Sequence, residues 1–293
     1  MGSDLLDRVA GAPISWGVCE VPGWGHQLRP ERVLSEMRQV GLAATELGPD
    51  GFLPAAPREM AGMLAVHGLR AVGGFVPMVL HQPHRDVVAR IAPVLESFAA
   101  AEVSTLVLAA GTGLDGYNHR ARLDGDQWRA LLGNLDRIRD TAAERGIAAT
   151  LHPHVGTLVE RPAEIARVLD GSSIPLCLDT GHLLVGGADP VRLAAEVPAR
   201  VGHVHLKDVD AALAARVRSR ELTYVQGVAA GLYRPLGHGD LDIAGVVRSL
   251  EAAGYQGWYV MEQDTILSRE PAPGEGPAAE VRASLAFLRE LGR

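Results

Sequence analysis

The chain has 293 residues, of which 47% are hydrophobic and 22% charged, which is typical of a globular protein with a sizeable core. Lys and Arg total 28 against 35 Asp and Glu, so the net charge is −7 and we expect no nucleic-acid partner. No stretch approaches the length of a membrane span, and we expect no membrane partner. The two cysteines, Cys19 and Cys177, match no paired motif, so we expect a reducing, cytoplasmic location.

Short apolar runs alternate along the chain with amphipathic stretches of helical period. The runs predict eight buried parallel strands, at Ala12–Val18, Ala43–Leu47, Ala71–Val76, Thr105–Ala109, Ala148–His152, Pro175–Asp179, Val201–Leu206 and Gly257–Glu262. This alternation predicts an α/β fold, a (β/α)₈ TIM barrel in one domain over residues 1–293, with a doubly wound open sheet as the alternative. Residues 208–231 exceed a simple connection and have a helical pattern, so we expect a helical insertion there.

Side chains that can bind metals fall at the ends of the predicted strands. These residues are Glu46, His152, His154, Asp179, His205, Lys207 and Glu262. In a TIM barrel the active site forms at the carboxyl ends of the strands, so these side chains are expected to converge. His152, Asp179, His205 and Glu262 would form a mixed nitrogen and oxygen site, which suits Mn²⁺, Co²⁺ or Zn²⁺ better than Ca²⁺.

Several of these residues also have a plainer structural explanation. Asp179 could cap a following helix, and His154 and His203 could be core histidines. Lys207 and Asp208 could be a solvated ion pair at the start of a loop. Burying many ionisable groups at strand ends is costly unless they pair or coordinate a metal, so the metal site is the favoured interpretation.

Motifs from the first predicted strand to the eighth resemble those of the inosose dehydratase family. They are Ala12-Pro13-Ile14-Ser15-Trp16-Gly17, Thr45-Glu46-Leu47-Gly48-Pro49, Gly74-Phe75-Val76-Pro77, Leu151-His152-Pro153-His154, Leu178-Asp179-Thr180-Gly181-His182, His203-Val204-His205-Leu206-Lys207-Asp208 and Val260-Met261-Glu262-Gln263-Asp264. The Asp-x-x-His and His-x-Lys-Asp pieces mark the wider xylose-isomerase-like barrel superfamily. The resemblance covers nearly the whole chain.

The resemblance implies a metal-dependent dehydratase that converts 2-keto-myo-inositol to a trihydroxycyclohexane-dione through an enediolate. Glu262 or Lys207 would remove the proton next to the carbonyl, and His182 or His154 would help the β-hydroxyl to leave. The residues expected to contact substrate are Glu46, Trp16, Phe75, His182 and Lys207, with Trp24 as a further wall. The partner is then a small polyol ketone, and the sequence leaves open whether the chain forms a homo-oligomer.

Two departures from the superfamily pattern bear on the substrate. The usual ligand on the fifth strand is Glu, whereas this chain has His152, which disfavours the two-carboxylate proton exchange of epimerases. His238 stands where Glu is expected in the Leu-Gly-x-Gly-Asp loop. The alternatives are a metal-dependent ketose isomerase or epimerase, a nuclease, which the charge disfavours, and a sugar sensor without catalytic activity.

Overall fold

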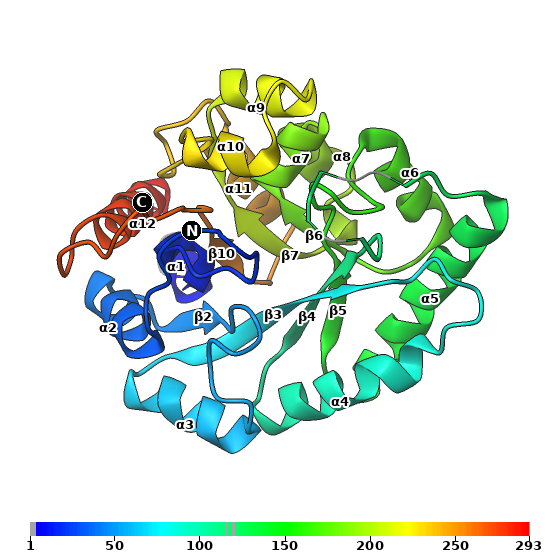
Figure 1. Cartoon of the computed structure of the whole chain (residues 1–293), viewed down its shortest axis with the longest axis horizontal. Helices are drawn as coiled ribbons and strands as arrows, with labels where there is room; N and C mark the ends of the chain where they lie inside the picture. Colours follow the sequence, from blue (N-terminus) through cyan, green and yellow to red (C-terminus); the bar gives the residue numbers. More distant parts are fainter. Residues whose placement is uncertain (1–3, 115, 119–120, 293) are drawn as a thin grey trace.

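The computed structural model of the chain describes residues 4–114, 116–118 and 121–292. Eight parallel strands close into a barrel in the order β1-β10-β7-β6-β5-β4-β3-β2 (Figure 1). They are β1 (Val9–Gly11), β2 (Ala44–Glu46), β3 (Arg70–Met78), β4 (Thr105–Ala110), β5 (Ala148–Leu151), β6 (Leu176–Asp179), β7 (Val201–Leu206) and β10 (Tyr259–Met261). The predicted TIM barrel is confirmed, and the open sheet is excluded because β1 pairs with both β2 and β10.

Helices surround this barrel in Figure 1 and connect its strands. They are α1 (Asp4–Asp7), α2 (Pro30–Val40), α3 (Pro57–Val66), α4 (Val87–Ala100), α5 (Gly125–Ala143), α6 (Pro162–Gly171), α7 (Thr180–Gly186), α8 (Pro190–Glu196), α9 (Ala211–Arg218), α10 (Tyr224–Ala229), α11 (Ile243–Ala252) and α12 (Pro277–Leu291). Several begin at proline, whose missing N–H needs no partner in a first helical turn. Among the described residues, no helix is both long and apolar enough to span a membrane.

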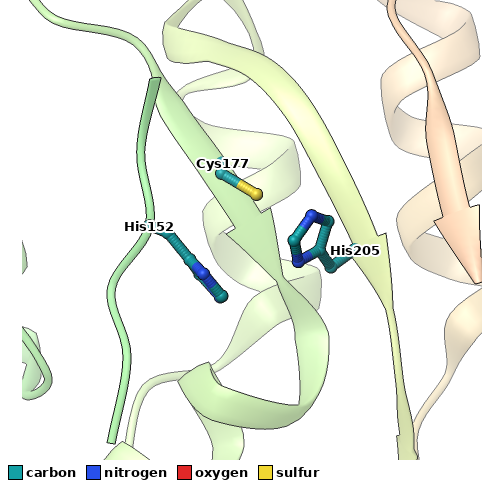
Figure 2. A group of neighbouring side chains, drawn as sticks. All are labelled: His152, Cys177 and His205. Carbon is teal, nitrogen blue, oxygen red and sulfur yellow. The ribbon is translucent and has the colours of Figure 1, made fainter. Parts of the chain in front are cut away.

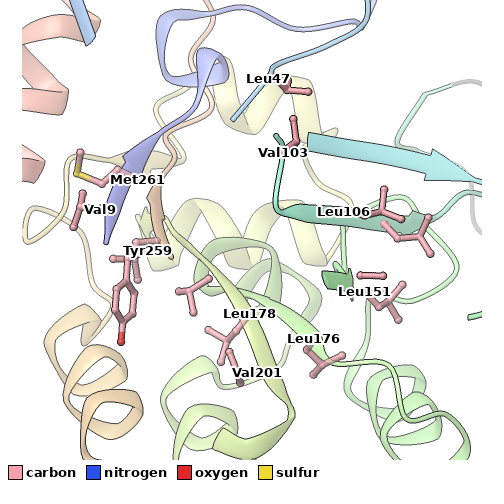
Figure 3. Packing of buried hydrophobic residues seen from close by; sticks show 14 of the residues in the cluster. Val9, Leu47, Val103, Leu106, Leu151, Leu176, Leu178, Val201, Tyr259 and Met261 are labelled. Carbon is pink, nitrogen blue, oxygen red and sulfur yellow. The ribbon is translucent and has the colours of Figure 1, made fainter. Parts of the chain in front are cut away.

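Branched aliphatic side chains fill the space between strands and helices (Figure 3). Leu106, Leu151, Leu176 and Leu178, on the neighbouring strands β4, β5 and β6, are completely buried. Each such side chain stabilises the fold by about 1.5–3 kcal/mol. The strands therefore form a rigid base for the side chains at their carboxyl ends.

The first strand lies earlier in the chain than its predicted range, Ala12–Val18, and that prediction was wrong. The strand is Val9–Gly11, and residues Pro13–Trp16 form a 3₁₀ helix. Pro13 has no N–H to donate to a neighbouring strand, and its fixed φ suits the start of a helical turn. The turn closes when the backbone N–H of Gly17 donates to the carbonyl of Ile14. Residues that follow β1 consequently reach across the mouth of the barrel.

The segment after β7 holds β8 (Asp208–Val209), α9, α10 and β9 (Tyr233–Arg234), and β8 pairs with β9 in antiparallel fashion. Asp208 is fully buried, and its carboxylate accepts hydrogen bonds from the backbone N–H groups of Gly237, Gly239 and Leu241. Asp208 is therefore no member of a solvated pair with Lys207. It holds the Gly-rich loop and so fixes where the segment returns to the barrel.

Candidate metal centre

A cavity of about 660 Å³ opens at the carboxyl ends of the barrel strands. Its floor carries polar side chains, and its walls are apolar and aromatic. The polar residues are Glu20, Glu46, His152, His154, His205, Lys207, Glu262 and Asp264, and the apolar and aromatic ones include Ile14, Trp24, Phe75, Tyr117 and Tyr224.

Three of the four predicted metal ligands, His152, His205 and Glu262, line this cavity, and the fourth, Asp179, lies buried beside them. His152 directly follows β5, Asp179 ends β6, His205 is on β7 and Glu262 directly follows β10. Nε2 of His152 is 3.2 Å from Oδ2 of Asp179, and Nδ1 of His205 is 3.5 Å from the same oxygen. Nδ1 of His205 is also 3.1 Å from Oε2 of Glu262. Ligand atoms of Asp179, His205 and Glu262 lie within 4.8 Å of one another, so one ion could reach these three side chains, and His152 joins the group through Asp179.

Several polar atoms of these side chains have no hydrogen-bond partner in the described part of the chain, which fits a bound cation. Among the described residues, neither ring nitrogen of His152 has a hydrogen-bond partner, and neither Oδ2 of Asp179 nor Nδ1 of His205 has one. All three side chains are at most 2% exposed, and buried polar atoms are rarely left unpaired. Burial opposes a charge on His205, yet Cys177, Glu262 and Glu46 raise its pKa well above the usual value. The site therefore favours positive charge, which a divalent ion could supply by displacing protons.

Asp179 caps a helix, as its position suggested, and keeps its second oxygen available for the predicted metal-ligand role. Its Oδ1 accepts a 2.7 Å hydrogen bond from the backbone N–H of His182 and so caps α7. The other oxygen, Oδ2, faces the two histidines. Capping fixes the carboxylate rotamer, so the free oxygen is held in the direction that a metal ligand needs.

Glu46, which was expected to contact substrate, lines the cavity, and the structure also gives its carboxylate two histidine partners. Oε1 of Glu46 is 2.8 Å from Nε2 of His203 and 3.0 Å from Nε2 of His205. Burial opposes its ionisation, but His205 and His203 hold the pKa of Glu46 below its usual value. A carboxylate at Nε2 leaves Nδ1 of His205 as the ring nitrogen that faces Asp179 and Glu262. His203, interpreted from sequence as a core histidine, is the second residue that holds Glu46.

Lys207 is enclosed by carboxylates. Its Nζ lies 2.6 Å from Oδ1 of Asp264, 3.0 Å from Oε2 of Glu262 and 3.5 Å from Oδ2 of Asp179. Although burial alone would lower it, Asp179, Asp264 and Glu262 raise the pKa of Lys207 well above its usual value. In this environment Lys207 is an ammonium group, so it can donate a proton or stabilise an anion, and it is no free base.

Asp264 had no role assigned from sequence, although it lies inside the last motif. It accepts hydrogen bonds from Lys207 and from the hydroxyl of Tyr224, which in turn lies 3.0 Å from the hydroxyl of Tyr233. These tyrosines belong to α10 and β9. The segment after β7 thus reaches the site through a buried chain of polar groups, which no periodicity in the sequence revealed.

His154 and His182 form a neutral pair of closely spaced, tilted rings beside Lys207. Their ring centroids are 3.8 Å apart, and Nε2 of His182 is 3.2 Å from Nζ of Lys207. Burial lowers the pKa of His154 to about 3, and burial together with His154 and Lys207 lowers that of His182 well below its usual value. Nδ1–H of His154 donates to the carbonyl of Val155. His154 lines the cavity and is suited to orient a substrate hydroxyl, whereas His182 is buried behind it and was not placed on the lining as predicted.

Of the three aromatic residues expected to line the site, two line the cavity and one lies in the core. Phe75 lines the cavity and its ring lies 5.8 Å from that of His152, and Trp24 lines the cavity as well. Trp16 is completely buried and donates its indole N–H to Glu36, so it belongs to the core behind the cavity. Tyr117 and Tyr224, which were not predicted, complete the walls.

The candidate metal ligands meet at the carboxyl ends of the strands of a closed barrel, which is where TIM-barrel active sites lie. A family model described as "Xylose isomerase-like TIM barrel" matches residues 34–291, and the chain belongs to this family. Among curated proteins, the "Rhizopine catabolism protein MocC" of Rhizobium meliloti is 32% identical over 268 residues, which is 88% of this chain and 81% of that protein.

An inosose dehydratase from Geobacillus thermodenitrificans is 29% identical over 264 residues, 86% of this chain and 88% of that protein. The resemblance to inosose dehydratases seen in the motifs is thus confirmed. Among solved structures, D-psicose 3-epimerase from Clostridium cellulolyticum H10 superposes with a TM-score of 0.69 at 15% identity, over 97% of this chain and 99% of that one. The probable 3-DHS dehydratase AsbF from Bacillus anthracis gives 0.67 at 15% identity, over 96% and 98%. At such identities these structures support the fold alone.

Proposed function

We propose that the protein is a metal-dependent hydro-lyase that removes water from 2-keto-myo-inositol to give a trihydroxycyclohexane-dione. The observation that carries the proposal is the cluster of unpaired, buried ligand atoms on His152, Asp179 and His205 beside the paired charges of Glu262 and Lys207. Similarity to curated inosose dehydratases supports the choice of substrate. Mn²⁺ or Co²⁺ suits the ligands best, and Zn²⁺ is the alternative.

A divalent ion held by His152, Asp179, His205 and Glu262 would polarise the substrate ketone and acidify the neighbouring C–H. Glu262 is the base in this scheme, because Lys207 is already protonated. His205 and Lys207 lower the pKa of Glu262 to about 2 despite its burial, so this carboxylate is ionised, and as a weak base it depends on the bound ion to acidify the C–H. Its place on the cavity lining gives substrate access to it.

Lys207 is the acid that protonates the departing hydroxyl. Once Glu262 has taken the proton from carbon, one of the three anionic neighbours of Lys207 is neutralised and the ammonium releases its proton more readily. The C–O bond then breaks and water leaves. The 3.0 Å separation of Nζ and Oε2 lets the proton on Glu262 return to Lys207, which restores both groups. The neutral ring of His154, which lines the cavity and lies against that of His182, orients the leaving hydroxyl.

The one-sided placement of carboxylates favours elimination over epimerisation. An epimerase that uses two carboxylates needs one on each face of the sugar, and His152 occupies the place of the second. Glu262 therefore has no carboxylate partner at β5 for such an exchange. The second candidate function is a ketose isomerase or epimerase, which the solved epimerases of the same fold keep open.

The test replaces Glu262 by Gln, which keeps the shape of the side chain and removes its basicity. We expect Glu262→Gln to lose turnover of 2-keto-myo-inositol by at least about 10²-fold, the lower end of general-base effects. Glu36→Gln is the control, since Glu36 is also a buried carboxylate and lies outside the cavity. Substantial residual turnover by Glu262→Gln would rule out the role of this carboxylate.

Incubation in deuterated water separates the two functions. A dehydratase forms the dione product, whereas an epimerase returns sugar with deuterium bound to carbon and forms no dione. Mass spectrometry of substrate and product after partial conversion distinguishes them. Deuterated sugar without dione would contradict the dehydratase proposal and support the second candidate.

A further inference from the structure

Cys177 lies one layer below the metal centre in the wall of the barrel. It precedes Asp179 by two residues on β6, so both side chains point to the same face of the strand. Along the strand the two positions are separated by about 6.6 Å. In Figure 2, Cys177 lies on β6 between His152, which follows β5, and His205 on β7. The thiol and the two imidazoles are thus contributed by three adjacent segments of the barrel.

The ligand atoms of these three residues lie within 4.8 Å of one another, and all three residues are buried. Ligand atoms on a tetrahedral ion bound by sulfur and nitrogen are separated by roughly 3.5 Å. Side-chain rotations that move each atom by less than about 1 Å would therefore bring them into coordination distance.

A second observation shows that this group is more than an isolated buried cysteine. His152 is 2% exposed and, within the described part of the chain, both of its ring nitrogens lack a hydrogen-bond partner. A buried imidazole whose two nitrogens are both unpaired can offer either nitrogen to an ion. Nδ1 of His205 is unpaired in the same way.

We propose that His152, Cys177 and His205 form a second coordination set, which binds thiophilic divalent ions such as Cd²⁺ and Zn²⁺ below the oxygen-rich set of the metal centre. Soft ions select sulfur ligands, whereas Mn²⁺ prefers the carboxylates of Asp179 and Glu262. The thiol releases its proton to solvent as the metal–sulfur bond forms. Three protein ligands leave a fourth tetrahedral position for water.

The two sets share both histidines, so the two kinds of ion compete. An ion bound to Cys177 draws His152 and His205 away from Asp179 and Glu262 and thereby empties the upper set. The chain would then take up one ion in total, and soft ions would block the site. Competition of this kind goes beyond the proposed dehydratase activity and does not depend on it.

The experiment uses the full-length protein without substrate. Titration of the metal-free protein with Cd²⁺ should produce a sulfur-to-metal charge-transfer absorption that saturates at one ion per chain. Cys177→Ser should abolish this absorption and weaken Cd²⁺ binding at least tenfold, while Mn²⁺ affinity measured by electron paramagnetic resonance changes less than twofold. Cys19→Ser, which removes the other cysteine, is the matched control and should retain the absorption.

Addition of one equivalent of Cd²⁺ to the Mn²⁺-loaded protein should release the bound Mn²⁺. If Cys177→Ser fails to fold, the ¹¹³Cd resonance of the unmodified protein decides instead, because sulfur ligation shifts it far downfield of sites with only nitrogen and oxygen. The proposal is overturned if the absorption persists in Cys177→Ser, if it disappears in Cys19→Ser, or if Cd²⁺ and Mn²⁺ bind together. A protein that binds Cd²⁺ as expected and turns over no inosose would refute the proposed function alone.

Discussion

Replacing Glu46 by Gln tests whether this buried carboxylate positions His205 for metal binding. The carboxylate oxygen Oε1 lies close to the Nε2 atoms of His203 and His205, at 2.8 and 3.0 Å. An amide has only one accepting atom and carries no charge, so it cannot serve both imidazoles in the same way. Nδ1 of His205 would then no longer be held as the basic nitrogen that faces Asp179 and Glu262.

The expected loss of Mn²⁺ affinity follows from these contacts. A hydrogen bond to a charged group contributes about 1.5–3 kcal/mol, and Gln removes the charge from both bonds. Loss of a partner that orients a ligating histidine weakens metal affinity about 10–100-fold. We therefore expect the dissociation constant of Mn²⁺ to rise about 10–100-fold in Glu46→Gln, with saturating Mn²⁺ restoring occupancy.

Mn²⁺ binding is measured by electron paramagnetic resonance of the free ion, with thermal unfolding of the same samples to check the fold. Glu36→Gln, which alters another buried carboxylate that accepts a hydrogen bond from a ring N–H, should leave Mn²⁺ affinity unchanged. A folded Glu46→Gln protein that binds Mn²⁺ within twofold of the unmodified protein would refute the positioning role.

Three further outcomes are expected. Mn²⁺ at a hundred times its dissociation constant should raise the free energy of unfolding by about 2.7 kcal/mol over the chelated protein, and an unchanged melting temperature would contradict the metal site. Tyr224→Phe should cost about 1.5–3 kcal/mol in urea unfolding, because Tyr224 donates to the carboxylate of Asp264. Tyr255→Phe, which loses a bond to a neutral carbonyl, should cost about 1 kcal/mol, and an equal cost for both would refute the argument. Burial and Glu20 raise the pKa of the Cys19 thiol. Its thiolate fraction, and with it the alkylation rate followed by peptide mass spectrometry, should therefore rise about tenfold per pH unit past about pH 9. An alkylation rate that reaches a plateau near about pH 8.5 would contradict this.

The barrel and the convergence of the candidate metal ligands could be predicted because their signals are local. Buried strands have continuous apolar runs, and a polar residue that ends such a run stands out, as His152 and Asp179 do. The carboxyl ends of parallel strands meet at one end of a barrel, so residues far apart in sequence could be expected to converge. The distances of 3.2 and 3.5 Å around Oδ2 of Asp179 show that the structure brings these residues together.

Features that depend on tertiary contacts could not be predicted in the same way. The role of Glu46 depends on two histidines on another strand, and that of Asp264 on tyrosines from the segment after β7. Trp16 was expected to line the site because it lies in the first of the family motifs, yet its indole N–H donates to Glu36 in the core. The position of β1 was missed because an apolar run that contains Pro13 has the same periodicity as a strand although it folds as a 3₁₀ helix.

Mixing the Mn²⁺-loaded protein with 2-keto-myo-inositol and following ultraviolet absorbance tests the proposed function most directly. The account predicts growth of the absorbance of a conjugated enol-dione, lost when a chelator removes the ion and restored when Mn²⁺ or Co²⁺ is added back. Absence of this absorbance, with one metal ion bound per chain, would contradict the dehydratase assignment.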